Sequence, residues 1–154
     1  MPAKSVLFTV LASAALLTPA APAAAAPAPP RQQQVNLVAA LSGKQEVPRN
    51  SGDPDATGVA LLTLHRNGRL CYVLHVRDVD GDITQAHIHR GLSGHDGPVA
   101  TALSEPMWHG SAAACTNLGR RQTERLWNAP QRYYVNVHSS KYPDGALRGQ
   151  LRLT

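Results

Sequence analysis

The sequence predicts an all-β domain, an antiparallel β-sandwich or β-barrel with one short helical segment. From residue 35 onward, Gly, Pro, Asn or Asp interrupts the chain roughly every ten residues, and the runs between these breaks are rich in Val, Leu, Tyr and Thr. The pair Asn67-Gly68 separates two such runs, which indicates a β-hairpin whose type I′ turn needs positive φ. The turn signal Tyr-Pro-Asp-Gly at 142–145 separates the last two runs in the same way.

The positions of these turn residues predict where each strand begins and ends. Strands are expected at residues 35–41, 57–65, 70–77, 83–89, 98–103, 133–138 and 146–153. A long polar loop is expected at residues 42–56. The stretch 104–131 is the least regular, and within it residues 120–128 predict one or two helical turns that Pro130 ends. Leu118 and Trp127 are expected to cover an open end of the sandwich.

The N-terminal residues are expected to lie outside the domain. Lys4, the apolar run 5–17 and the Ala/Pro-rich stretch after it have the order of a secretory signal peptide, which we assign to residues 1–26. Residues 27–34 then form a Pro/Ala-rich linker, and 35–154 form one domain. The alternative, an uncleaved anchor, would need a longer run of about 20 apolar residues. We therefore expect a secreted protein, extracellular or in the cell envelope, with no membrane span after cleavage.

The two cysteines, Cys71 and Cys115, have two interpretations. In an exported protein such a pair most simply forms a disulfide, and closing a loop of this length adds about 3–4 kcal/mol if the geometry permits. Alternatively, one or both thiolates bind a metal ion. The export signal favours the disulfide.

The net charge of +5 comes mostly from arginines scattered along the sequence. A nucleic-acid-binding domain would concentrate basic residues in a patch or stripe with aromatic residues beside it, and aromatic residues make up only 5% of this chain. We therefore expect no nucleic-acid partner. The charge favours solubility and affinity for an anionic cell-surface polymer.

The segment Ala-His-Ile-His-Arg-Gly, residues 86–91, is the first candidate site. In a strand, residues two apart share a face, so His87 and His89 lie side by side while Ile88 points into the core. Imidazole nitrogens bind copper or zinc at about 2.0 Å, so both rings can reach one ion. Two ligands make a weak site, and a His-x-His pair also occurs by chance.

A third histidine strengthens the metal hypothesis. His138 ends the expected strand 133–138 and completes a three-histidine site if that strand lies beside 83–89. His95 either adds a further ligand or simply belongs to the turn of its Gly-rich loop. The nearby Asn136, Arg148 and Gln150 either orient the imidazoles or pair across strands. We recognise no catalytic nucleophile with its base, so the sequence assigns no catalytic residue.

Several of these segments together resemble the CHRD domain: QEVP at 45–48, AHIHRG at 86–91, GPV at 97–99 and YVNVHSSKYPDGALRGQL at 134–151. The resemblance covers nearly all of residues 35–154 and is most specific in the last segment. It departs at the Arg-Gly after AHIH and at Ser139-Ser140, where the family more often has other small residues, Pro or Thr. CHRD domains occur repeated in chordin, which binds growth factors, and singly in exported bacterial proteins. The resemblance therefore implies an interaction module rather than a defined activity.

The order of the histidines is also similar to that in copper-zinc superoxide dismutase, an eight-stranded Greek-key barrel. There a His-x-His pair on one strand and a histidine on a late strand hold copper. We therefore expect a Greek-key β-sandwich or barrel that is either superoxide-dismutase-like or immunoglobulin-like. The similarity to the dismutase implies that His87, His89 and His138 are copper ligands. The dismutase also has a long loop with several zinc-binding histidines, whereas the loop here offers only His95 and Asp96. The similarity therefore does not extend to a zinc site or to rapid dismutation.

Two hypotheses of function follow. The favoured one is a non-enzymatic interaction or cell-envelope module, with an unknown protein or a cell-surface polymer as partner and with copper or zinc bound through the three histidines. The alternative is a copper-binding, dismutase-like protein for metal handling or weak dismutation. The sequence does not indicate the oligomeric state. The distances among the three imidazole rings distinguish a metal site from ordinary polar residues.

Overall fold

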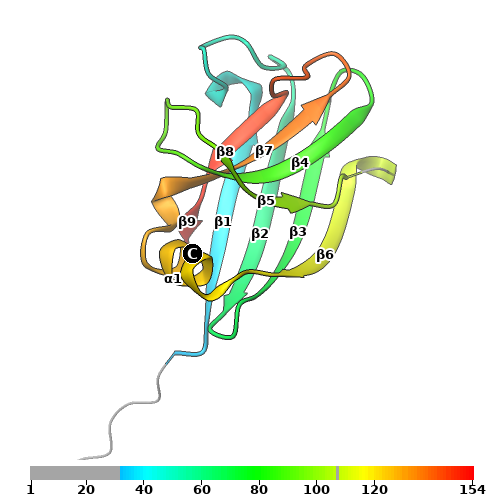
Figure 1. The fold of residues 1–154 in the computed structure, drawn as a ribbon. Coiled ribbons are helices and arrows are strands. Elements are labelled where there is room, and N and C mark those ends of the chain that lie inside the picture. Colours follow the sequence, from blue (N-terminus) through cyan, green and yellow to red (C-terminus); the bar gives the residue numbers. More distant parts are fainter. Residues whose placement is uncertain (1–31, 107) are drawn as a thin grey trace, which may run out of the picture. The chain divides into compact units, whose positions relative to one another are not determined.

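The chain folds into an antiparallel β-barrel that is open along one seam (Figure 1). The computed structural model describes residues 32–106 and 108–154; the predicted signal peptide and linker residues 27–31 lie outside them. The strand order is β5-β4-β7-β8-β1-β2-β3-β6, with β9 also paired to β1. The seam runs between β5 and β6, the two ends of this order. The pairing of β4 with β7 and of β3 with β6, neither consecutive in the chain, gives the Greek-key arrangement that was predicted.

The elements have the following bounds. The strands are β1 Gln34–Ser42, β2 Thr57–His65, β3 Arg69–Arg77, β4 Ile83–Arg90, β5 Val99–Leu103, β6 Ser111–Asn117, β7 Tyr133–Ser139, β8 Leu147–Gln150 and β9 Arg152–Leu153. The helix is α1 Arg120–Asn128, and the 3-10 turns are η1 Gly43–Gln45, η2 Trp108–Gly110 and η3 Pro130–Arg132. The predicted strands and helix are found within a residue or two, except that the last strand is divided at Leu151 into β8 and β9.

The core lies between the inner faces of two halves of the barrel. Strands β1, β2 and β3 face β4, β7 and β8 across it, because each presents every second residue inward. The largest fully buried apolar side chains in this core are Leu37, Leu64, Leu70, Leu74, Ile88, Leu126, Leu147, Leu151, Val135 and Val137. As predicted, Leu118 is buried and Trp127 packs against this core, where the Arg66 guanidinium lies 3.8 Å from the Trp127 ring centroid.

The hairpin between β2 and β3 forms where it was predicted, but its turn differs from the expected type. Pairing ends at Leu64 and Leu70, and residues 66–68 make the loop. Of these only Gly68 has positive φ (95°), whereas a type I′ turn would need it at Asn67 as well. Asn67 instead accepts a hydrogen bond from the Arg69 backbone N–H on its side-chain oxygen, at 3.1 Å. The longer loop thus gives Gly68 the left-handed position.

Strand β6 is the element that the sequence pattern does not predict. Its residues Ser-Ala-Ala-Ala-Cys-Thr-Asn include few β-branched and no aromatic side chains, so their local preference for a strand is weak. Pairing with β3 sets Cys71 opposite Cys115, and these cysteines form a disulfide. The disulfide prediction is confirmed, and it indicates an extracytoplasmic compartment. No helix in the described ranges is long and apolar enough to cross a membrane.

Candidate metal site

The three predicted histidines meet on the outer face of the sheet formed by β4 and β7. The register pairs Gln85 with His138 and His87 with Asn136. His138 therefore lies diagonally across from His87, at a separation that long side chains can bridge. Ile88 points the other way and is buried in the core, as predicted.

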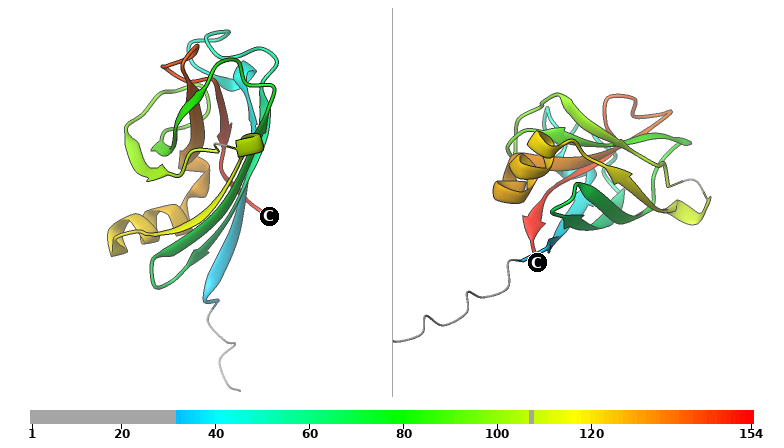
Figure 2. Two further views of the ribbon diagram at one scale, coloured as in Figure 1. Left: turned by 90° about the vertical axis from the view of Figure 1, so that its right-hand side faces the viewer. Right: turned by 60° about the horizontal axis from the view of Figure 1, so that its bottom comes forward.

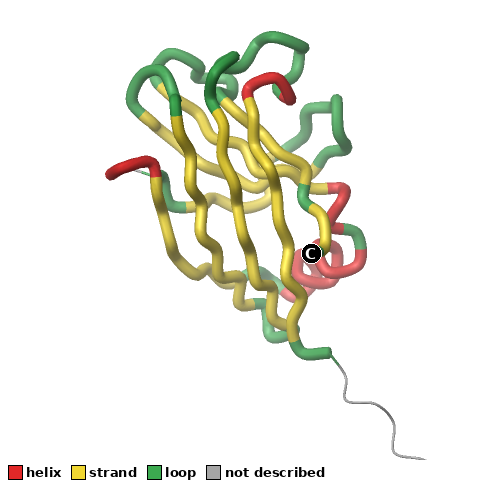
Figure 3. Tube along the Cα trace, turned by 180° about the vertical axis from the view of Figure 1, so that it is seen from behind, coloured by secondary structure: helices red, strands yellow, loops and turns green. Residues whose placement is uncertain are grey.

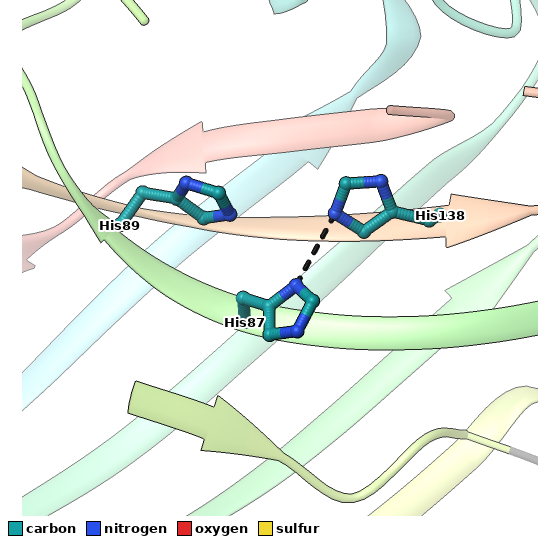
Figure 4. A group of neighbouring side chains, drawn as sticks. All are labelled: His87, His89 and His138. Atoms are coloured by element: carbon teal, nitrogen blue, oxygen red, sulfur yellow. Dashed lines mark hydrogen bonds between the residues drawn. The ribbon is translucent and has the colours of Figure 1, made fainter. Parts of the chain in front are cut away.

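The imidazole rings converge (Figure 4). Each histidine offers one ring nitrogen, and these nitrogens all lie within 4.8 Å of one another. His87 Nδ1 and His138 Nε2 are 3.3 Å apart. Two nitrogens on one tetrahedral zinc or copper ion at about 2.0 Å stand about 3.3 Å apart, so this pair already has the spacing of co-ligands.

Two backbone carbonyls fix how the rings present their nitrogens. His89 Nδ1 donates to Gly97 O at 2.9 Å, and His138 Nδ1 donates to Pro143 O at 2.9 Å. A carbonyl only accepts, so in each neutral ring the proton is on Nδ1 and Nε2 carries a free lone pair. This is the arrangement in which a second partner orients a metal-binding imidazole.

One of these nitrogens has no partner. His89 Nε2 is buried and makes no hydrogen bond within the described residues. Leaving a buried polar atom unpaired costs about 1–3 kcal/mol, so such an atom calls for an explanation. A metal ion at the centre of the three rings would satisfy it.

His87 differs from the other two because its contacts assign the opposite tautomer. Since His138 Nε2 carries the lone pair, the 3.3 Å contact requires the proton to sit on His87 Nδ1. To bind a metal ion through Nδ1, His87 would have to move this proton to Nε2. The ring is partly exposed, so water can carry the exchange.

Burial and neighbouring groups favour the neutral form of His87 and His89, the two histidines of β4. Burial lowers the pKa of His87, and the adjacent His138 and His89 lower it further. Burial also lowers the pKa of His89, although the hydrogen bond to Gly97 acts in the opposite direction. Neutral imidazoles are the form that binds metal, so these two residues stay competent to somewhat lower pH than an ordinary histidine.

The loop at 91–98 holds His89 in place. Gly97 accepts from the His89 ring and donates its backbone N–H to the Tyr134 hydroxyl at 3.3 Å. A Cβ on Gly97 would lie 1.8 Å from Arg90 O, so only glycine fits there. The His89 ring stacks on Tyr134 at 4.9 Å between centroids, with the planes 13° apart. This role of Gly97 was not predictable from the sequence, where it is simply one residue of a Gly-rich loop.

Arg148 braces the same loop from β8. Its side chain is only 2% exposed, and it donates to His95 O at 3.1 Å and to Leu92 O at 3.4 Å. It also forms an ion pair with Asp96 at 3.2 Å and lies 3.6 Å from the Tyr134 ring centroid. Two roles were considered for Arg148, and its contacts favour the one in which it helps to orient the imidazoles. It does so indirectly, because it contacts Tyr134, on which the His89 ring stacks, and the loop 91–98, whose Gly97 accepts a hydrogen bond from His89.

The other candidate residues have different outcomes. His95 is exposed and is not among the three converging histidines; it contributes its backbone oxygen to Arg148. Gln150 binds the backbone oxygens of Gly91, Gln131 and Tyr133, which ties strand ends together. Asn136 is buried between His87 and Arg148 in the register, and its Oδ1 has no partner within the described residues.

A buried carboxyl group from the loop 42–56 is a neighbour that the sequence did not indicate. Glu46 is 4% exposed, and burial raises its pKa to about 7 despite the opposing attraction of Arg148. Its Oε1 lacks a hydrogen-bond partner among the described residues. A Cβ on Gly145 would lie 2.7 Å from its Oε2, so the carboxyl group fits only because residue 145 is glycine.

The comparison with known families agrees with this structure. Residues 37–151 match the CHRD domain. The chain belongs to the CHRD-domain family. The match spans the barrel from β1 to β8, so the resemblance seen in the sequence is confirmed. No curated protein matches the chain significantly. Membership of the CHRD family assigns no activity by itself, and the function of this domain has to be argued from its site.

Proposed function

We propose that this CHRD domain is an exported, non-enzymatic module that binds one copper or zinc ion through His87, His89 and His138. The observation that carries the proposal is the buried, unpaired Nε2 of His89 beside two further imidazole nitrogens. Nitrogen ligands of this kind suit copper and zinc, and a fourth position would remain for water or another ligand. The bound ion would tie β4 to β7 and so stabilise the module.

A second candidate is a copper-binding, dismutase-like activity. It is favoured by the partial exposure of His87, which leaves one side of the three-nitrogen cluster open to a small anion. The assay for this activity compares the rate of superoxide consumption by the copper-loaded protein with the rate for free copper at the same concentration. We rank it second because Arg148, which would have to attract a small anion to the site, is buried and paired with Asp96.

Isothermal titration of the metal-free chain with Cu(II) and Zn(II) tests the proposal. We expect one equivalent to bind, with the Cu(II) electron paramagnetic resonance spectrum showing imidazole nitrogen coupling. At a free metal concentration of 100 Kd the native state gains about 2.7 kcal/mol, which raises Tm by several degrees. In His87→Ala/His89→Ala this binding and the Tm increase should both disappear.

The matched control is His65→Ala/His95→Ala, which removes two histidines outside the cluster. It should bind the metal as the wild type does. If both double variants take up one equivalent with similar affinity, the metal site lies elsewhere and the proposal is wrong. A wild-type chain that binds no metal and keeps its Tm would leave only the interaction module.

A further inference from the structure

Four arginines from three separate elements surround a row of hollows on the barrel surface. Three adjoining hollows of about 450, 260 and 230 Å³ are all lined by Arg90. Arg125 and Arg132 each line two of them, and Arg121 lines one. None of the three clustered histidines lines any of them. In the sequence these arginines look scattered; the fold brings the end of β4, helix α1 and turn η3 together.

The positive charge of these arginines is uncompensated. All four are exposed, and none of their side chains forms an ion pair or hydrogen bond within residues 32–106 and 108–154. Two carboxylates line the hollows, and each pairs with another arginine: Glu124 with Arg120 at 3.8 Å, and Asp96 with Arg148 at 3.2 Å. The guanidinium groups around the hollows are therefore available to an outside anion.

The backbone that carries the arginines is fixed by hydrogen bonds. Gln122 in α1 donates to Ala100 O of β5 at 2.7 Å, which holds the helix against the barrel. Gly91 N donates to Arg132 O at 2.8 Å, and Gln150 donates to the oxygens of both Gly91 and Gln131 at 2.8 Å. Figure 2 shows α1 and the turn after it, in gold and orange, side by side. The guanidinium groups thus project from a built surface.

We propose that this arginine patch (Arg90, Arg121, Arg125 and Arg132) binds an anionic polysaccharide through its sulfate or phosphate groups. Guanidinium groups present planar donor pairs that match such tetrahedral anions, and they do so better than ammonium groups. A row of adjoining hollows suits successive charges along a chain. Nucleic acid fits less well, because the one aromatic residue that lines the hollows, Tyr133, is 4% exposed and offers no stacking platform.

The test measures binding of the whole chain to fluorescent heparin fragments and to a fluorescent phosphomannan, two anionic polysaccharides, by anisotropy over a range of NaCl concentrations. The first probe carries sulfate and the second phosphate, so the two arms identify which group the patch prefers. The variant is Arg90→Gln/Arg125→Gln/Arg132→Gln. The matched control is Lys44→Gln/Arg49→Gln/Arg77→Gln, which removes the same charge from exposed positions outside the hollows.

We expect the patch variant to bind the preferred probe at least tenfold more weakly and with a shallower salt dependence. The control variant should stay within about threefold of the wild type, and both should keep the wild-type Tm, since every replaced side chain is exposed. Equal weakening of the two variants would show attraction to net charge alone and overturn the proposal. So would the absence of binding to both probes, or tighter binding of duplex DNA through the same three arginines.

Discussion

Strands β3 and β7 alternate similarly in sequence but are buried differently. In β3 every second residue is buried, and the intervening Cys71, Val73 and His75 face outward beneath no described helix or loop (Figure 3). In β7 all seven residues are buried. Its outward residues Tyr134, Asn136 and His138 are polar or amphipathic, yet they are covered. An alternating pattern therefore does not show which face of a strand water reaches.

The cover over β7 is held in place by the polar side chains themselves. His89 and His138 bind backbone oxygens of two different turns, and Arg148 binds two more from the loop 91–98. Desolvating these groups costs free energy that a bare apolar face would not incur. Three of the buried polar or charged side chains, Asn136, His138 and Arg148, lie on the face that holds the candidate site.

The largest expected difference between the two faces is at Arg148. Replacing it with Met leaves Leu92 O and His95 O without their donor and removes a charge that lies against Tyr134. Leaving two carbonyls without their charged donor costs about 1–3 kcal/mol for each one. The exposed Arg77 at the end of β3, changed to Met, should cost less than about 0.5 kcal/mol. Urea unfolding monitored by fluorescence gives both values, and equal small losses would show that the brace contributes little.

The buried carboxyl group of Glu46 should make the stability of the protein depend on pH. Glu46 has a pKa of about 7 when folded against an ordinary 4.5, so between these values the unfolded chain releases a proton that the folded chain keeps. Stability therefore falls as pH rises through this window, by up to about 3 kcal/mol at 1.36 kcal/mol per unit. Glu46→Gln should remove this fall, matching the wild type near pH 4 and exceeding it at pH 8. Superimposable Tm profiles of the two proteins would contradict the raised pKa.

These differences mark where the sequence stops being informative. Strand β2 was predicted to the residue, because its alternation and its flanking turn signals agree. Strand β6 was missed, because its alanines pack acceptably in many conformations and pairing with β3 decides the outcome. Local preference thus predicts elements only where tertiary contacts do not override it.

The candidate site also contains residues that the sequence predicts and residues that it does not. His87, His89 and His138 were predictable, because side chains two apart share a face and a late histidine on a neighbouring strand can join them. The carbonyls of Gly97 and Pro143 were not, because a backbone acceptor has no residue signature. Glu46 was not either, since it lies in the loop 42–56, whose polar composition predicts exposure rather than burial. The residues around the rings depend on how loops close, which the sequence pattern does not encode.

The smallest expected effect lies on the open face. Leu61 in β2 is 50% exposed and stands opposite Val73 of β3, which is 49% exposed. Leu61→Thr keeps a strand-favouring side chain and should change the free energy of unfolding by less than about 0.5 kcal/mol. Its neighbour Leu62 is 2% exposed, and Leu62→Ala should cost about 2–5 kcal/mol by opening a cavity. If Leu61→Thr instead costs more than 1 kcal/mol, with a midpoint that shifts with protein concentration, this face is buried against a second copy of the chain, because self-association links stability to concentration.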